Sequence, residues 1–174
     1  MMQPDYGEGK SSRYYDHMTF QVRGRLAVAS RSEFGDACPI DRTSSLVARR
    51  STILLLREAS YGTTRYDDFV RRTGLTESVT AAQLKGLVSK GLLARRPYHE
   101  PHQRQRFEYV LSEAGHDLVP ILLALGAWGD KHRPESYRLK AVHAECGATV
   151  QVAVRCAKGH EVPETEVVVG LERR

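Results

Sequence analysis

The stretch YGTTRYDDFVRRTGLTESVTAAQLKGLVSKGLLARRPYHEPHQRQRFEYVL, residues 61–111, decides the fold of this chain. It predicts a helix, a tight turn at Gly74, and a second helix from Glu77 to about Lys90. Two short strands follow, residues 92–98 and 106–111, separated by a polar loop. Helix, turn, helix and hairpin form the layout of a winged helix-turn-helix, which places its second helix in the major groove of DNA.

The segments on either side predict further helices. Cys38-Pro39 opens one long helix or two short ones, broken near residues 48–51 and ending near Glu58, since proline suits a first helical turn. Thr64 with Asp67 has the spacing of a capping box for the first helix of the motif. Ser112 should cap a longer helix through about Lys131, which Pro120 kinks.

The fold class expected from this pattern is mainly α with a small amount of β, built on the winged helix. We expect three parts. Residues 1–35 form a weakly structured extension in which 20–34 could hold a strand or a short helix. Residues 36–133 form the DNA-binding domain. Residues 134–174 alternate β-branched with polar residues and form a β-rich appendage of two or three short strands.

Charge is distributed unevenly along the chain. The net charge is +5, and residues 38–133 hold 15 basic against 10 acidic side chains, whereas the segments before and after are balanced. Between Lys85 and Arg106, six basic residues face a single acid, Glu100. A basic strip on a compact domain suits a polyanion, although charge runs are also common on ordinary solvated faces.

Other function classes receive no support from the sequence. No apolar run approaches the ~18 residues that cross a bilayer, and no secretory signal is visible, so we expect a cytoplasmic protein with no membrane partner. Phosphate-binding glycine loops, nucleophile elbows and suggestively spaced carboxylate pairs are absent. We therefore expect no enzymatic activity.

The order of residues resembles the HxlR family of winged-helix transcriptional regulators, relatives of the MarR group. The resemblance covers residues 36–133. It rests on CPI at 38–40, VARRSTILLLRE at 47–58, YGTTRYDDFVRRTGLTESVTAAQLKGLVSKGLLARRPY at 61–98, and RFEYVLSEAGHDLVPILLALGAWGDKH at 106–132.

This resemblance implies a homodimer whose first and last helices pack between subunits. One recognition helix per subunit would enter adjacent major grooves of a pseudo-palindromic operator, most often as a repressor. Three departures stand out: Ser51 replaces a common tryptophan, the recognition helix begins without positive charge, and Thr80 replaces an apolar residue. A small-molecule effector could bind between the dimer helices near Leu122, Leu125 and Trp128, although ordinary core or dimer packing is the plainer interpretation.

Two sets of side chains are candidates for DNA contacts. On the second helix, side chains that reach base edges would set the base preference: Ser78, Thr80, Ala81, Gln83 and Lys85. Near the hairpin, arginines would bind phosphates or the adjacent minor groove and supply salt-dependent affinity: Arg65, Arg95, Arg96, Arg104 and Arg106. The plainer alternatives are solvent-facing polar groups, and surface ion pairs of the arginines with Glu100 or Glu108.

The three cysteines suggest two further roles. Cys38 begins a helix, where the dipole favours a thiolate, and some members of the resembling family sense oxidants through a cysteine there. A partly buried structural thiol is the alternative. The tail carries the spacing H-x2-C-x9-C-x3-H, which could hold a structural zinc through His143, Cys146, Cys156 and His160. A metal-free β-hairpin with two free thiols is the rival.

The leading hypothesis is therefore a dimeric, sequence-specific DNA-binding regulator. A winged helix used only for protein–protein contact is a second hypothesis. A thiol- or zinc-dependent sensor, in which the tail carries the main function, is a third. Binding to specific and random DNA across a salt series discriminates the first hypothesis from the second.

Overall fold

The computed structural model describes residues 20–28, 38–99 and 105–171. The chain groups into two compact units, one of Asp36–Val152 and one that combines Met1–Gly35 with Ala153–Arg174. We describe each unit by itself.

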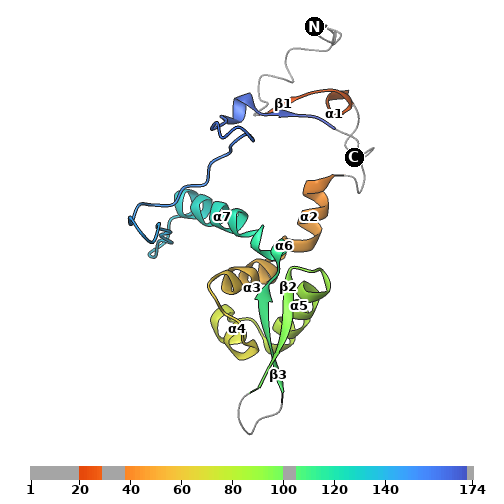
Figure 1. Cartoon of the computed structure of the whole chain (residues 1–174), viewed down its shortest axis with the longest axis vertical. Coiled ribbons are helices and arrows are strands. Elements are labelled where there is room, and N and C mark those ends of the chain that lie inside the picture. Colours follow the sequence, from red (N-terminus) through yellow and green to blue (C-terminus); the bar gives the residue numbers. More distant parts are fainter. Residues whose placement is uncertain (1–19, 29–37, 100–104, 172–174) are drawn as a thin grey trace. The chain divides into compact units, whose positions relative to one another are not determined.

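The larger unit is mostly helical with one small β-hairpin, which confirms the expected fold class (Figure 1). Its elements follow in the order α2 (Pro39–Val47), α3 (Arg50–Ser60), α4 (Tyr66–Thr73), α5 (Glu77–Ser89), β2 (Leu93–Tyr98), β3 (Arg106–Leu111), α6 (Glu113–His116) and α7 (Val119–His132). Strands β2 and β3 pair antiparallel, from Leu93 opposite Leu111 to Tyr98 opposite Arg106. Helices α4 and α5 are the helix-turn-helix, and the hairpin is the wing.

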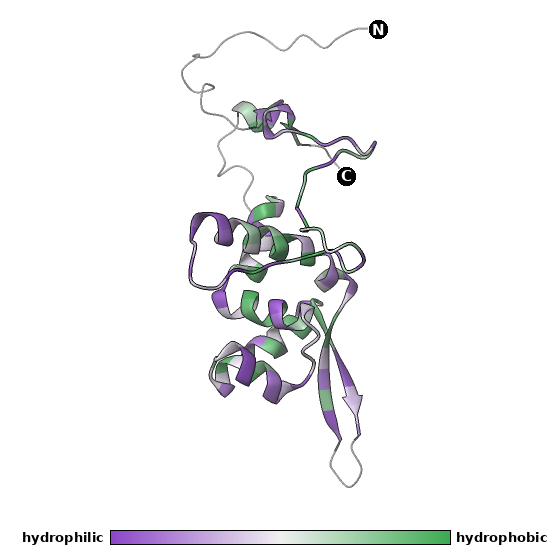
Figure 2. Ribbon diagram, turned by 90° about the vertical axis from the view of Figure 1, so that its left-hand side faces the viewer, coloured by the Kyte–Doolittle hydropathy of each residue, from purple (hydrophilic) through white to green (hydrophobic). Residues whose placement is uncertain are grey.

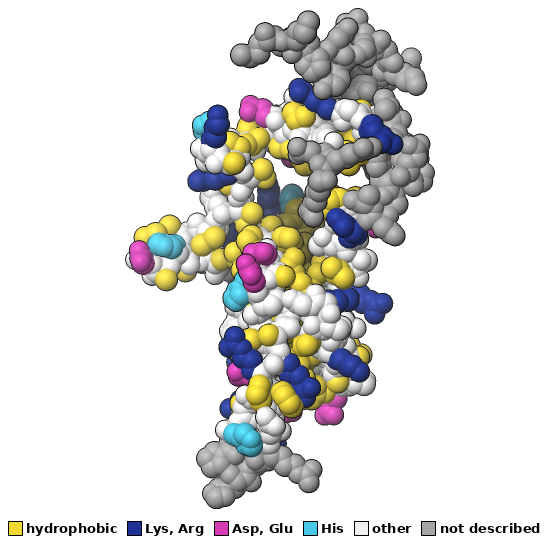
Figure 3. Space-filling view, turned by 45° about the vertical axis from the view of Figure 1, so that its right-hand side comes forward, with side chains coloured by type: hydrophobic (Ala, Val, Ile, Leu, Met, Phe, Trp, Pro, Cys, Tyr) yellow, Lys and Arg dark blue, Asp and Glu magenta, His cyan; other side chains and the backbone are white. Residues whose placement is uncertain are grey.

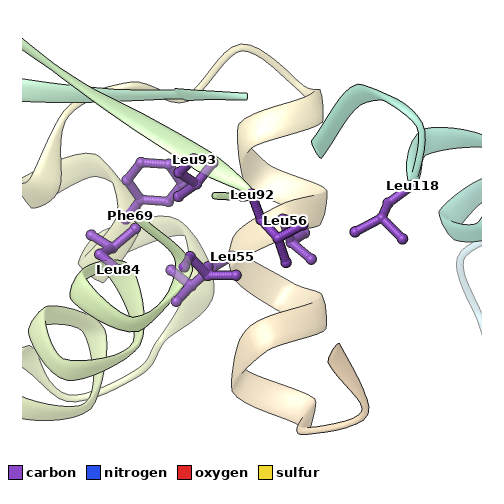
Figure 4. Close-up of a cluster of buried hydrophobic side chains, with 8 residues drawn as sticks. Leu55, Leu56, Phe69, Leu84, Leu92, Leu93 and Leu118 are labelled. Atoms are coloured by element: carbon purple, nitrogen blue, oxygen red, sulfur yellow. The ribbon is translucent and has the colours of Figure 1, made fainter. Parts of the chain in front are cut away.

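One leucine-rich core fixes these elements to one another. Leu55 and Leu56 of α3 meet Phe69 of α4 and Leu84 of α5, and Leu118 reaches the cluster beside α3 (Figure 4). The remaining members lie on α5 and at the base of the hairpin: Leu87, Leu92 and Leu93. Each fully buried leucine or phenylalanine side chain contributes roughly 1.5–3 kcal/mol, so this cluster is the main stabilising feature of the domain.

The hairpin is also tied directly to the segment that enters α4. The Tyr109 amide donates to the Thr64 carbonyl at 2.8 Å, and Arg65 forms an isolated antiparallel bridge with Glu108. The Phe69 and Tyr109 rings meet edge to face with centroids 6.4 Å apart. These contacts hold the hairpin in a fixed position relative to the helix-turn-helix.

Two helix boundaries differ from the sequence-based expectation. Thr64 is not a helix cap: α4 begins at Tyr66, Arg65 is its N-cap, and no side chain caps it. Ser112 does cap a helix, accepting a hydrogen bond from the Gly115 amide at 3.1 Å, but α6 ends at His116. Pro120 then lies in the first turn of α7 and so begins a new helix instead of kinking one. Of the two alternatives for residues 39–58, the structure has two short helices, with the break at Ala48 and Arg49.

Gly115 allows α6 to pack closely against the base of the hairpin. A Cβ at this position would clash with the carbonyl oxygen of Leu92, at the base of the hairpin. The absence of a side chain therefore lets α6 approach the hairpin backbone, and the Ser112 amide and hydroxyl both bond there, to Leu92 and Gly91 carbonyls.

The segment after α7 folds back along that helix. Arg138 Nε donates to Asp130 Oδ2 at 2.7 Å, and the Leu139 side chain lies against Gly126, where a Cβ would come within 2.9 Å of it. Farther on, Val142 forms a bridge with Thr149 around a tight turn.

The smaller unit joins segments from both ends of the chain. Strand β1 (Gln21–Val22) and helix α1 (Arg25–Val28) occupy the N-terminal segment, so this segment contains both a strand and a short helix. The 3-10 helix η4 (Glu164–Glu166) precedes β4 (Val168–Val169), which pairs parallel with β1.

Candidate nucleic-acid interface

The turn between α4 and α5 is fixed by backbone geometry and one tyrosine. Gly74 ends α4 in the left-handed region with φ 65°, which other residues adopt at a cost. Thr76 caps α5 as predicted, with its hydroxyl accepting from the Val79 amide at 3.4 Å. Tyr66 of α4 donates its hydroxyl to the Glu77 carbonyl at 2.8 Å and so links the two helices.

The Tyr66 phenol is held in its protonated, hydrogen-donating form. Burial raises the pKa of Tyr66, and the carboxylates of Glu77 and Asp67 raise it further. The raised pKa extends to higher pH the range in which the phenol donates to the Glu77 carbonyl and links α5 to α4. Sequence periodicity indicated Tyr66 as an apolar position of the helix but gave no signal for this hydrogen bond.

The exposed surface of α5 carries Glu77 at its start, then small side chains and one lysine. Ser78, Ala82, Lys85 and Ser89 follow at helical spacing, and all are exposed. Ala81 is exposed beside them, and Val79 is 39% exposed. The structure therefore places Ser78, Ala81 and Lys85 on the outer surface, as the sequence predicts, and adds Ala82, which was not among the predicted residues. The helical spacing i, i+4 and i+7 from Ser78 could have identified Ala82.

Thr80 and Gln83 lie elsewhere on the helix, and the burial of Thr80 corrects the expectation that its side chain reads bases. Thr80 is 0% exposed and faces the core between α5 and its neighbours. Gln83 is half-buried, and its Oε1 accepts a hydrogen bond from the Thr52 hydroxyl of α3 at 3.0 Å. Thr80 occupies a position that is commonly apolar in the resembling family, and that departure was the sequence signal for its burial.

Burial leaves the Thr80 hydroxyl without a partner, which predicts a stabilising substitution. Thr80 Oγ1 is the buried side-chain oxygen without a hydrogen-bond partner among the described residues. Thr80→Val should therefore raise the free energy of unfolding by about 1 kcal/mol, because an unpaired buried hydroxyl loses its hydration without compensation. Chemical denaturation measures this change.

Thr52→Val is the matched control for that substitution. The Thr52 hydroxyl is equally buried, at 2% exposure, but it is bonded to Gln83. This variant should lose about 1 kcal/mol of stability. If both variants changed the free energy of unfolding equally and in the same direction, the Thr80 hydroxyl would not be the unpaired group.

Arginines line both sides of the hairpin and its junction with α4. The Arg65 guanidinium lies 4.7 Å from the Tyr98 ring centroid, and that of Arg95 lies 3.4 Å from the Phe107 centroid. Arg106 Nη1 is 3.9 Å from Asp67 Oδ2, a long pair between exposed side chains. Arg96 is exposed and lies opposite Glu108 in the hairpin register. Arg104 lies outside the described residues.

These guanidiniums are partly preorganised by aromatic rings and stay accessible. The groove between α4 and the hairpin is lined by Arg65, Tyr66, Asp67, Arg95, Tyr98, Arg106, Phe107 and Tyr109. The hairpin extends beyond the helices, and hydrophilic residues predominate along its arms (Figure 2). On the face drawn in Figure 3, several Lys and Arg side chains lie on the lower part of the domain, toward the end of the hairpin that carries the loop. The arrangement presents positive charge to a polyanion beside α5.

On α4 itself, part of the positive charge is neutralised internally. Arg71 Nη2 donates to Asp68 Oδ1 at 2.6 Å, and this hydrogen bond lowers the pKa of Asp68, with Coulomb attraction by Arg71 and Arg72 adding to it. Because the folded-state pKa is lowered, the pair favours folding above the ordinary aspartate pKa. That contribution is lost as pH falls through the lowered value.

The cysteine and histidine candidates lie outside this interface. Cys38 is half-buried at the N-cap of α2. In the larger unit, His143 Nδ1 lies 3.2 Å from Cys146 Sγ across a tight turn closed by Gly147. In the smaller unit, Cys156 and His160 flank a similar turn, and the His160 carbonyl accepts from the Cys156 amide at 3.0 Å.

Within either unit, the described residues gather no three His, Cys, Asp or Glu side chains of the kind that hold a metal ion. The four tail residues divide between the two units, so the zinc site stays a prediction. None of the described helices is long and apolar enough to cross a membrane.

Comparison with known proteins also identifies a helix-turn-helix in this chain. Residues 46–137 match the model of the HxlR-like helix-turn-helix family. An uncharacterized HTH-type transcriptional regulator of Mycobacterium tuberculosis is 34% identical over 145 residues, which cover 82% of this chain and 90% of that protein. The regulator YybR of Bacillus subtilis, also uncharacterized, is 30% identical over 106 residues, which cover 59% of this chain and 83% of YybR.

Two solved structures of regulatory proteins also resemble this chain. The crystal structure of PA1607, assigned as a transcription factor, superposes with a TM-score of 0.66 at 28% identity, covering 75% of this chain and 92% of that one. The redox regulator HypR in its reduced form gives a TM-score of 0.51 at 29% identity and covers 57% of this chain and 100% of HypR. With its helix-turn-helix, basic wing and matching sequence, the chain belongs to the HxlR-like helix-turn-helix family of transcriptional regulators.

Proposed function

We propose that this protein is a homodimeric repressor that binds a pseudo-palindromic operator. Helix α5 of each subunit lies in a major groove, and the hairpin arginines contact the backbone or the adjacent minor groove. The observation that carries this proposal is that the basic hairpin packs beside α5 on the same leucine-rich core.

The dimer is supported by an apolar face on α7 that the described chain leaves uncovered. Ile121, Leu125 and Trp128 recur at i, i+4 and i+7 and are 48%, 50% and 58% exposed. The Trp128 ring also stacks near that of His132, with centroids 5.0 Å apart. Exposed apolar side chains that gather on one helix face mark a partner surface more often than a solvated one.

Helix α2 adds a second uncovered apolar surface. Ile40 is 78% exposed and Leu46 is 38% exposed, and none of the residues of α2 is buried. Helices α2 and α7 are the first and last helices of the DNA-binding domain. A second copy of the chain that covers both is the simplest partner, since two-fold dimers match two-fold operators.

An effector site at these helices is a further part of the proposal. Leu122 packs against the core cluster, whereas Leu125 and Trp128 are exposed. A small molecule there would therefore bind at the subunit interface instead of inside a single subunit.

Selection of binding sites from a random DNA pool tests the proposal directly. The selected sites should contain two inverted half-sites about one helical turn apart. A reporter gene under such a site should be expressed less when the protein is present. Single, non-repeated sites would contradict the dimer, and increased expression would contradict repression. A protein-interaction module, the alternative, would select no sequence.

Cys38 supports an additional proposal of thiol-dependent regulation. It is half-buried at the first turn of α2, next to the exposed Ile40, and the structurally similar HypR is a redox regulator. Oxidation here would alter the surface that α2 offers to a partner. Cys38→Ser should therefore make operator binding insensitive to peroxide or quinone, as a mobility shift measures. A variant as sensitive as the wild type would exclude the switch.

Zinc binding by the tail is likewise proposed. His143 and Cys146 in one turn, with Cys156 and His160 in another, supply the N and S donors that structural zinc prefers. Metal analysis of protein purified without chelators should find about one zinc per chain, lost in Cys146→Ser/Cys156→Ser. Metal-free wild-type protein would establish the apo hairpin with two free thiols.

A further inference from the structure

The centre of the outer surface of the recognition helix carries mostly small side chains. Ser78, Ala82, Lys85 and Ser89 define its centre, with Ala81 beside them. The Ser78 hydroxyl lies 3.2 Å from that of Thr76, and the Ser89 hydroxyl donates to the Gly86 carbonyl at 2.9 Å. Each hydroxyl therefore already has a partner, at the N-cap for Ser78 and inside the helix for Ser89.

Two other polar side chains of α5 are turned away from this surface. Thr80 is fully buried, and the Gln83 carboxamide oxygen is held by Thr52. At the first turn, the Glu77 carbonyl is occupied by Tyr66. Apart from the exposed Glu77 carboxylate at its start, α5 presents over its first turns a set of exposed methyl groups, on Val79, Ala81 and Ala82, followed by the Lys85 ammonium.

We propose that α5 selects its operator by apolar contact of Ala81 and Ala82 with the C5-methyl groups of thymine. This inference rests on the proposed placement of α5 in the major groove. Thymine is the base that presents a methyl group there, and alanine is among the side chains that contact it. Short side chains also let the helix backbone approach the base edges closely. Lys85, one turn further, then contacts guanine O6 and N7 or a phosphate.

Replacing thymine with deoxyuridine tests this inference, since the exchange removes only the C5-methyl group. The operator is first selected from a random pool by the wild-type protein. Each thymine of one half-site is then exchanged in turn, and binding is measured by fluorescence anisotropy. We expect affinity to fall about three- to tenfold at one or two thymines per half-site, in line with the transfer of a single methyl group. Binding to random DNA should not change.

Protein variants assign the effect to individual side chains. In Ala82→Gly or Ala81→Gly, one of the sensitive thymines should lose its sensitivity to deoxyuridine. Ala114→Gly on α6 is the matched control, because Ala114 is also an exposed helical alanine but lies outside the recognition helix. It should leave the order of preferred sites unchanged. Thermal denaturation confirms that the glycine variants are folded.

The outcomes separate this inference from the proposed function. A selected operator whose half-sites tolerate deoxyuridine at every thymine would overturn methyl reading and leave the repressor proposal intact. Deoxyuridine sensitivity that persists at every thymine in both Ala81→Gly and Ala82→Gly would also overturn it. Failure to select any sequence would overturn the proposed function, and methyl reading with it.

Discussion

Replacing Leu125 and Trp128 together with glutamate should convert the dimer into a monomer and lower operator affinity by about a hundredfold or more. Both side chains are half exposed on α7 and share a face with Ile121. Two carboxylates there would lose their hydration in a dimer interface, which costs far more than two surface charges. A monomer then binds each half-site separately and loses the avidity of a linked pair, typically ~10²–10⁴-fold.

Analytical ultracentrifugation and anisotropy on the selected operator measure both parts of this prediction. Ala127→Glu is the matched control, because Ala127 is exposed on α7 but lies away from the row of Ile121, Leu125 and Trp128. This control should remain dimeric. A doubly substituted protein that stays dimeric, or a wild type that is monomeric at micromolar concentration, would contradict the role of this face.

Replacing Arg95 and Arg106 with alanine should weaken binding to operator and random DNA alike. Both guanidiniums are accessible on the hairpin, Arg95 over the Phe107 ring and Arg106 near Asp67. For every phosphate that the variant no longer neutralises, the slope of log affinity against log salt should become shallower by about 0.9. The order of preferred base sequences should not change, since interactions with the DNA backbone carry little sequence information.

Arg95→Lys/Arg106→Lys provides the control for the wing. Lysine retains the positive charge but loses the planar group that stacks on an aromatic ring. The salt slope should therefore stay close to that of the wild type, whereas affinity falls modestly. Alanine variants with an unchanged salt slope would show that these arginines do not bind phosphates.

The helix-turn-helix could be predicted from the sequence because its signals are local. Gly74 ends one helix, Thr76 caps the next, and leucines recur at the spacing of a buried stripe. Helix breaks that depend on tertiary packing were harder to predict. Gly115 of α6 approaches the Leu92 carbonyl closely, and no sequence periodicity indicates such an approach.

The candidate site was predicted less well than the fold, because polarity alone does not reveal which way a helical side chain faces. Thr80 and Gln83 are residue types that often contact bases. In this structure Thr80 is buried, and the Gln83 side chain is hydrogen-bonded to Thr52. Ala82 lacks a polar group and so gives no sign of base recognition, although its helical phase with Ser78 and Lys85 places it on the outer surface. The parallel pairing of β1 with β4 joins residues far apart in the chain and leaves no local signal.

A salt series of binding to the selected operator and to random DNA of equal length tests the central claim most directly. If α5 reads bases while the hairpin binds the backbone, both DNAs should show strong salt dependence. The operator should be bound about a thousandfold or more tightly than random DNA at physiological salt. Equal affinity for the two DNAs at every salt concentration, or no binding to either, would contradict the claim.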